Sequence, residues 1–223
     1  MANLIAVMGE SGSGKTTSLR NLDPSTTYII DADKKGLSWR GWKAQYSEEK
    51  KNYVAMDDNA QILERMRLID KHKMLKHIKT VVIDTVNGVM VADEYAKKDT
   101  KGYDKWADLA WAVWGIVDYA LTMRDDMTVI FMAHSQTERD DSGVMFTRIK
   151  TSGRKLDKLV LESKFTTVLN AKVVNGEYVF ETRSPTSTAK APMGLFDSTT
   201  IPNDIKKVID AIDEYNGVTN EKE

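Results

Sequence analysis

A glycine-rich segment near the start of the chain has the residue types and the spacing that phosphate binding requires. Residues 9–16 read Gly-Glu-Ser-Gly-Ser-Gly-Lys-Thr and follow the P-loop pattern G-x-x-x-x-G-K-[ST]. Glycines let the backbone take a tight, partly left-handed path that turns its N–H groups toward an anion. In such a loop Lys15 reaches the β- and γ-phosphates, and the Thr16 hydroxyl is offered to Mg²⁺. The predicted site for ATP and Mg²⁺ comprises Gly9, Glu10, Ser11, Gly12, Ser13, Gly14, Lys15, Thr16 and Thr17.

Two acids follow the next apolar run of the chain. Residues 26–31 are rich in strand-favouring side chains and end in Asp31, with Asp33 two positions later. Ligands of α/β proteins sit at the carboxyl ends of parallel strands, so either acid is a candidate for the base that activates water. The alternative for each is that it only caps the following turn.

Two further apolar runs end in polar residues that suit the same chemistry. Residues 80–83 favour a strand and precede Asp84, which is the pattern of a Walker B strand. We expect Asp84 to hold Mg²⁺ together with Thr16. Residues 127–133 form a buried run that is followed by His134 and then by Gln136. One of these two would contact the γ-phosphate and report its loss, the alternative for His134 being a structural histidine.

Alternating strand and helix patterns must position these residues. Strands are predicted at residues 4–8, 26–31, 53–56, 80–84, 127–133, 165–173 and 177–182, the last two joined by an Asn175–Gly176 turn. Helices are predicted at residues 16–22, 59–75, 86–98, 106–124 and 203–215, with a break at residues 100–102. This order favours an α/β fold with a mainly parallel sheet, helices on both faces and a late β-hairpin. We predict one domain over residues 1–215 and a frayed polar tail at 216–223.

Composition narrows the classes of function. The 223 residues contain no cysteine, which excludes disulfides, thiolate zinc sites and a cysteine nucleophile. Three histidines are too few and too scattered for a histidine metal cluster. No apolar run reaches the length of a membrane span and the start lacks the basic residues of a signal peptide, so we expect a soluble, cytoplasmic protein. A net charge of -1 offers no global attraction to nucleic acid, so any DNA site must be a local basic patch.

These motifs resemble those of RecA-type P-loop ATPases over roughly residues 3–200. More narrowly, the chain is similar to the small phage AAA-family ATPases, which include the Sak-group single-strand recombination ATPases. Residues 28–33 read Tyr-Ile-Ile-Asp-Ala-Asp, and the corresponding RecA strand ends in Ile-Asp-Ala and the glutamate that activates water. The resemblance therefore assigns the base to Asp33 rather than Asp31, with a side chain one methylene shorter. A hydroxyl residue, Thr85, follows the Walker B acid as in RecA. The implied catalytic set is Lys15, Asp33, Asp84, His134 and Gln136.

The resemblance also implies partners. It predicts a RecA-like, homo-oligomeric ATPase that binds single-stranded DNA in recombination or annealing, in contact with a single-strand-binding protein, in the bacterial host cytoplasm if the chain is phage-encoded. The neighbouring subunit would supply Arg183 or Lys190 to the site. The family's DNA-contacting loop corresponds to a segment with four cations: Arg139, Arg148, Lys150 and Arg154. Alternatives are an ATPase that acts on a protein in DNA packaging, helicase loading or remodelling, a nucleotide-binding scaffold with little turnover, and, ranked last, a phosphotransferase.

Overall fold

The computed structural model describes residues 1–98, 104–139, 143–151 and 160–217, and its description of side chains in the helix at residues 104–122 begins at Val113. The predicted break at residues 100–102, the cation Arg154 and residues 218–223 of the predicted tail lie outside the described residues.

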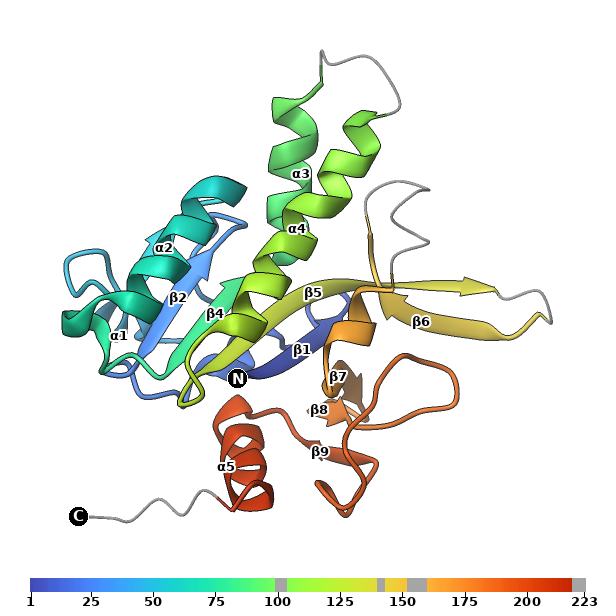
Figure 1. Cartoon of the computed structure of the whole chain (residues 1–223). Coiled ribbons are helices and arrows are strands. Elements are labelled where there is room, and N and C mark those ends of the chain that lie inside the picture. Colours follow the sequence, from blue (N-terminus) through green and yellow to red (C-terminus); the bar gives the residue numbers. More distant parts are fainter. Residues whose placement is uncertain (99–103, 140–142, 152–159, 218–223) are drawn as a thin grey trace.

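A nine-stranded sheet organises the described part of the chain (Figure 1). Its strands run in the order β3-β2-β4-β5-β1-β7-β8-β9, and β6 pairs with β5. Pairing is parallel from β3 to β7 and antiparallel for β7–β8, β8–β9 and β5–β6. The predicted, mainly parallel sheet with a late hairpin is thus confirmed. The strands are β1 (Asn3–Gly9), β2 (Thr27–Asp31), β3 (Tyr53–Ala55), β4 (Thr80–Asp84), β5 (Thr128–Arg139), β6 (Met145–Ile149), β7 (Thr167–Val174), β8 (Glu177–Glu181) and β9 (Thr200–Pro202).

Helices cover both faces of the sheet, and each face has its own buried core. Residues of β1 alternate between the cores: Ala6 and Met8 belong to one, Ile5 and Val7 to the other. This is how a strand buried on both faces behaves. The first core packs against α2 (Asn59–Lys71), α3 (Val86–Ala96) and α4 (Asp104–Thr122). The second packs against α1 (Trp42–Gln45), α5 (Ile205–Tyr215) and the 3-10 helix η1 (Thr16–Leu19). Two further 3-10 helices are η2 (Lys73–Leu75) and η4 (Leu161–Lys164).

Several predicted boundaries were wrong. The helix expected at residues 16–22 is the four-residue 3-10 helix η1, in which Arg20 N–H donates to Thr17 at 3.2 Å. The helix expected at 59–75 ends at Lys71. Strand β5 does not end at residue 133 but runs on to Arg139, because residues 135–139 pair with β6 in an antiparallel hairpin that projects from the body (Figure 1). The short strand β9 was not predicted.

The register of the parallel strands brings the predicted site residues to one edge of the sheet. Gly9 of β1 pairs with His134 of β5, and Asp31 of β2 pairs with Asp84 of β4. All four stand at or beyond the carboxyl ends of the parallel run, where α/β proteins bind ligands.

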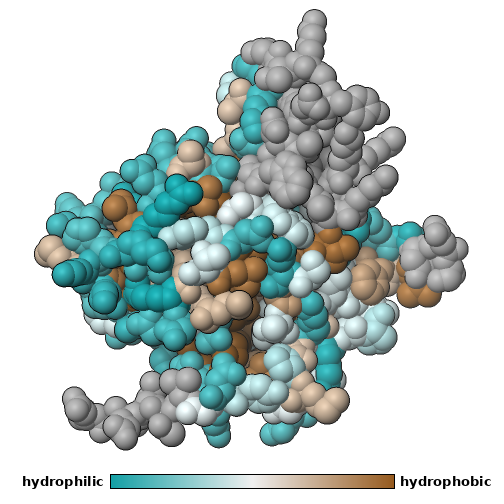
Figure 2. Space-filling view, viewed as in Figure 1, coloured by the Kyte–Doolittle hydropathy of each residue, from teal (hydrophilic) through white to brown (hydrophobic). Residues whose placement is uncertain are grey.

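The surface follows this architecture. In the view of Figure 2, hydrophilic residues cover most of the surface over α2. Hydrophobic residues gather near the centre of the visible face of the molecule, below α4. Among the described helices, none combines the length and the apolar composition that a membrane span requires.

Candidate functional site

The glycine-rich loop after β1 has the backbone that its sequence predicts. Gly12 and Gly14 have φ angles of 80° and 90°, in the left-handed region that favours glycine. A Cβ atom on Gly9 would lie 2.5 Å from Ser13 Oγ and 2.7 Å from the Ala171 carbonyl oxygen. The loop therefore closes tightly on itself at Gly9 and against β7, and a side chain there would force it open.

Lys15 lies inside this loop rather than on its surface. Its ammonium group donates hydrogen bonds of 2.8 Å to the carbonyl oxygens of Gly9 and Glu10, and the residue is 7% exposed. Burial lowers the pKa of Lys15 to about 8. Both acceptors are neutral carbonyl oxygens rather than carboxylates. The positive charge of Lys15 therefore remains available to a phosphate bound in the loop.

Thr16 and Asp84 meet although 68 positions separate them in the chain. Thr16 Oγ1 donates a hydrogen bond of 2.6 Å to Asp84 Oδ2. Asp84 is 1% exposed, and its second oxygen, Oδ1, is buried without a hydrogen-bond partner. Burial raises the pKa of this carboxyl to about 6. An orphaned carboxylate oxygen beside a hydroxyl is a donor set of hard oxygens, which is what Mg²⁺ prefers, so the residues present fit that ion.

Asp31, one of the two candidate bases, holds the loop that follows β2 through one carboxylate oxygen, Oδ2, while its Oδ1 atom is buried without a hydrogen-bond partner. Its Oδ2 atom accepts hydrogen bonds from Gly36 N at 2.7 Å and from the Tyr53 hydroxyl at 2.8 Å. The residue is 1% exposed. This is the capping role that the sequence left open as the alternative.

Asp33, the other candidate, faces the site. Its Oδ1 atom accepts a 2.8 Å hydrogen bond from the Thr85 hydroxyl, and its Oδ2 atom pairs with Lys35 Nζ at 2.5 Å. Burial works against ionisation, but the hydrogen bonds from Lys35 and Thr85 outweigh it and hold the pKa of Asp33 below its ordinary value. Asp33 is therefore a carboxylate at neutral pH, as a base must be.

The residue after the Walker B acid aligns this carboxylate. Thr85 is fully buried, caps α3 by accepting a 3.3 Å hydrogen bond from Gly88 N, and donates to Asp33 with the same hydroxyl. A Cβ atom on Gly88 would lie 2.8 Å from Asp33 Oδ1. The first turn of α3 thus packs directly against the carboxylate.

His134 lies at the same edge and is held there through its backbone. Its N–H donates to Asn87 Oδ1 at 2.7 Å, and Asn87 Nδ2 donates to the Lys150 carbonyl oxygen at 2.8 Å. Burial and then the charge of Lys15 lower the pKa of His134, so the imidazole is neutral at pH 7. His134, Asn87 and Asp33 line one cleft of about 540 Å³, bordered by Tyr95 of α3.

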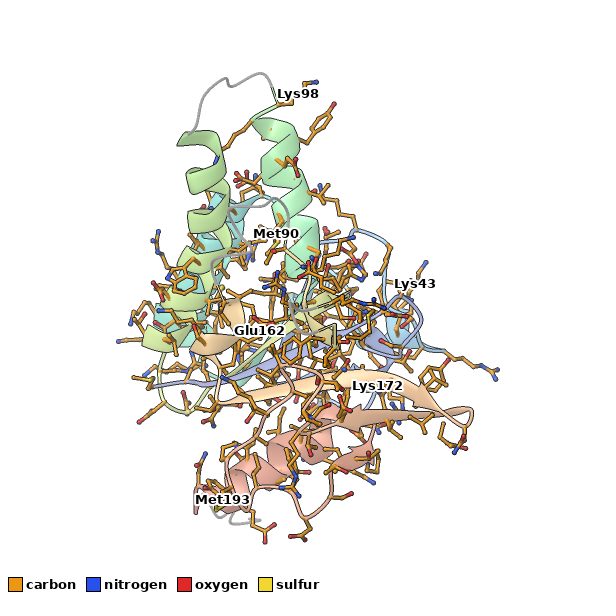
Figure 3. The ribbon with its side chains drawn as sticks, turned by 90° about the vertical axis from the view of Figure 1, so that its right-hand side faces the viewer. Lys43, Met90, Lys98, Glu162, Lys172 and Met193 are labelled. Atoms are coloured by element: carbon orange, nitrogen blue, oxygen red, sulfur yellow. The ribbon has the colours of Figure 1, made fainter. Side chains whose placement is uncertain are left out.

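A second cleft, of about 380 Å³, separates the P-loop from the β5–β6 hairpin. Ser13, Ser135 and Thr137 line it, with Lys172 on β7 (Figure 3). Gln136 lines neither of these two clefts. Its amide donates instead to Glu138 Oε1 at 2.9 Å.

The predicted DNA-contacting cations do not share one face of the hairpin. Arg139 pairs with Met145 and Arg148 pairs with Gln136, so the two arginines alternate to opposite faces. Arg148 Nη2 also forms a 3.0 Å ion pair with Glu138, whereas Arg139 and Lys150 are exposed.

The predicted trans cations lie away from the P-loop of their own chain. Lys190 is exposed and bonds through its backbone to Val168, which pairs with Ala6 in the middle of β1. Arg183 is exposed just beyond β8.

Sequence reasoning missed Lys35 and Asn87. A lysine in a polar loop and an asparagine in the first turn of a helix are common surface residues, and only their contacts single them out.

A comparison of the sequence with known protein families gave a match over residues 1–192 to the family described as the AAA domain. The chain belongs to this family. Its members are P-loop ATPases, so this AAA domain binds a nucleotide, typically with Mg²⁺. The match includes the P-loop, Asp33, Asp84 and His134 and stops before β9 and α5. A comparison with curated proteins gave no match.

Proposed function

We propose that the chain is a Mg²⁺-dependent ATPase in which Asp33 orients and deprotonates the attacking water. The observation that carries this proposal is the position of Asp33. The Thr85 hydroxyl aligns the Asp33 carboxylate. The backbone N–H of Asp33 donates to the Asp84 carbonyl oxygen at 3.3 Å, so the candidate base is held next to the candidate metal ligand. A base fixed relative to the phosphate-binding groups is what in-line phosphoryl transfer requires.

The other residues divide the remaining work. Lys15 and the P-loop N–H groups bind the phosphates, while Thr16 and Asp84 hold the metal. Bound Mg²⁺ neutralises the charge that develops on the phosphoryl oxygens. We assign the sensing of the γ-phosphate to His134 rather than Gln136, and the cleft that His134 shares with Asp33 supports this choice.

Hydrolysis by Asp33→Ala tests this assignment, with Asp57→Ala as the matched control. Asp57 borders the same cleft but pairs with Lys34 at 2.7 Å rather than with Lys35. We expect Asp33→Ala to lower kcat by about 100-fold or more, the usual loss for a general base, and Asp57→Ala to stay within about twofold. If Asp33→Ala hydrolyses ATP like the parent, Asp33 is not the general base. If the parent binds ATP but does not hydrolyse it, the protein is a nucleotide-binding scaffold and not an ATPase.

We further infer that the ATPase acts on single-stranded DNA in recombination or annealing, in the manner of the small phage ATPases it resembles. Strand β5 carries His134 and continues directly into the projecting hairpin (Figure 1). A shift of His134 on loss of the γ-phosphate would therefore be transmitted along β5 to Arg139 and, through β6, to Lys150. In a homo-oligomer, Arg183 or Lys190 would complete the neighbouring site.

Steady-state hydrolysis with single-stranded or duplex DNA at two salt concentrations tests the DNA partner. We expect stimulation by single strands that fades as salt rises, since phosphate contacts release counterions. Arg139→Gln and Lys150→Gln should reduce this stimulation. The control Lys43→Gln should not, because Lys43 is exposed on α1, which lies on the opposite side of the molecule from the β5–β6 hairpin (Figure 1). Hydrolysis that ignores both DNAs contradicts this inference and favours a protein partner.

A further inference from the structure

Lys35 is a second cation in the catalytic corner, and the chemistry proposed above leaves it without a role. Its Nζ atom lies 2.5 Å from Asp33 Oδ2, while half of its side chain is exposed. After burial, which dominates, the charge of Lys35 is among the influences on the pKa of Lys15 and of Asp84. The ammonium group therefore lies within electrostatic range of the residues that would hold the phosphates and the metal.

The backbone around Lys35 is firmly held. Gly36 N donates to the buried Asp31, which the Tyr53 hydroxyl holds in turn. Gly36 has a φ angle of 79°, and a Cβ atom there would lie 2.9 Å from the Trp42 ring. A long, half-exposed side chain on a fixed backbone can change partners without any rearrangement of the loop.

The adjacent lysine has a different partner at the same cleft. Lys34 Nζ pairs with Asp57 Oδ1 at 2.7 Å, at the rim of the cleft, and its side chain is 50% exposed. The two lysines are thus matched in type, loop and exposure, but of this pair it is Lys35 that contacts the candidate base.

The pairing of Lys35 with Asp33 conflicts with catalysis. Oδ1 of Asp33 accepts from Thr85 and Oδ2 from Lys35, and each oxygen keeps a second acceptor position. The ammonium group nevertheless takes one position on Oδ2, and its positive charge makes Asp33 a weaker base toward water. A triphosphate that enters the P-loop brings a negatively charged γ-phosphate into the same corner, where it competes with Asp33 for the ammonium group.

We propose that Lys35 is a γ-phosphate-binding residue that pairs with Asp33 in the absence of nucleotide and transfers to the γ-phosphate when a nucleoside triphosphate binds. Asp33 Oδ2 is then released for water only when there is a γ-phosphate to attack. This proposal rests on the proposed ATPase function and deepens it, because it makes the chain itself supply a cation that was otherwise expected from a neighbour.

Equilibrium binding separates this role from a structural one. The probes are ADP and a non-hydrolysable ATP analogue with an imido group between the β- and γ-phosphates, each with Mg²⁺, measured by titration calorimetry. Lys35→Met should weaken binding of the analogue by about tenfold or more, the value of one charge-assisted hydrogen bond, and change ADP binding by less than about twofold. Lys35→Arg should retain most of the preference for the analogue, and Lys34→Met should leave both affinities unchanged.

Each result decides the matter. Equal weakening of both nucleotides by Lys35→Met, or no weakening of either, overturns the proposal, and unchanged ADP binding shows that the variant is folded. A parent that binds the analogue more tightly than ADP through Lys35, yet never hydrolyses ATP, refutes the proposed hydrolysis and leaves the role of Lys35 standing. A parent without any preference for the analogue refutes the role of Lys35.

Discussion

Replacement of Thr85 by valine removes one hydroxyl that serves two elements of the site. Thr85 is fully buried, and its Oγ1 atom donates to Asp33 at 2.8 Å and accepts from Gly88 N at 3.3 Å. Valine has nearly the same shape, so Thr85→Val keeps the packing and deletes both hydrogen bonds. The substitution therefore asks whether this hydroxyl aligns the base or only caps α3.

The cost in stability follows from the two bonds. Loss of an N-cap side chain costs about 1 kcal/mol. Loss of a hydrogen bond to a carboxylate costs about 1.5–3 kcal/mol, and the lower end applies here because the carboxyl is 16% exposed and keeps Lys35. We expect the free energy of unfolding of Thr85→Val to fall by about 2–3 kcal/mol, measured by urea denaturation.

The effect on activity is expected to be larger than this loss of stability suggests. An Asp33 side chain that is free to rotate spends little time in the productive orientation, which should lower kcat by about 10- to 100-fold. Single-turnover hydrolysis at saturating ATP and at a temperature where both proteins are folded measures this step. Thr85→Ser, which keeps the hydroxyl, is the matched control and should recover most of the rate.

Two outcomes would refute this reasoning. If Thr85→Val is destabilised but hydrolyses ATP at the parental rate, Thr85 is only a helix cap. If Thr85→Ser loses as much activity as Thr85→Val, the methyl packing rather than the hydroxyl decides the rate.

Two further predictions concern stability. Burial raises the pKa of the Asp70 carboxyl, but hydrogen bonds from Lys71, the Arg124 backbone and Tyr119 outweigh it and leave the pKa below its ordinary value. A lowered pKa in the folded state gives stability that is complete above the unfolded pKa of about 4 and is lost as pH falls below it. Asp70→Asn should therefore be less stable at pH 7 and show a flatter fall of unfolding free energy in acid, and a fall as steep as that of the parent would contradict this. Gly14→Ala should be destabilised more than Gly176→Ala in thermal unfolding. Both glycines have positive φ, but a Cβ atom on Gly14 would also lie 2.7 Å from the Tyr178 ring, whereas one on Gly176 meets nothing within 4 Å; equal losses would mean that the ring moves aside at little cost.

Much of the fold could be predicted from local patterns. The P-loop and the late Asn175–Gly176 turn are recognisable because each needs a special backbone that few residues adopt, and Gly12, Gly14 and Gly176 take positive φ there. Apolar runs of the right length identified the buried strands of the parallel sheet. The extension of β5 to Arg139 escaped this reasoning because its polar outer half has no apolar period and is held by backbone pairing with β6.

The sequence by itself determined that phosphate-binding glycines, a lysine and acids at strand ends occur in the order of a P-loop ATPase, and the match to the AAA domain agrees with it. It did not separate the roles of Asp31 and Asp33, which stand two positions apart after one strand, without the help of a resemblance. Tertiary structure gives them different partners, because Tyr53 of β3 donates to Asp31 and Thr85, the N-cap of α3, donates to Asp33. Lys35 likewise could not be singled out from the sequence, because only its contact with Asp33 in the folded chain points to a role. Spacing along the chain dictates backbone conformation, but the state of a carboxylate depends on donors that only folding brings within hydrogen-bond distance.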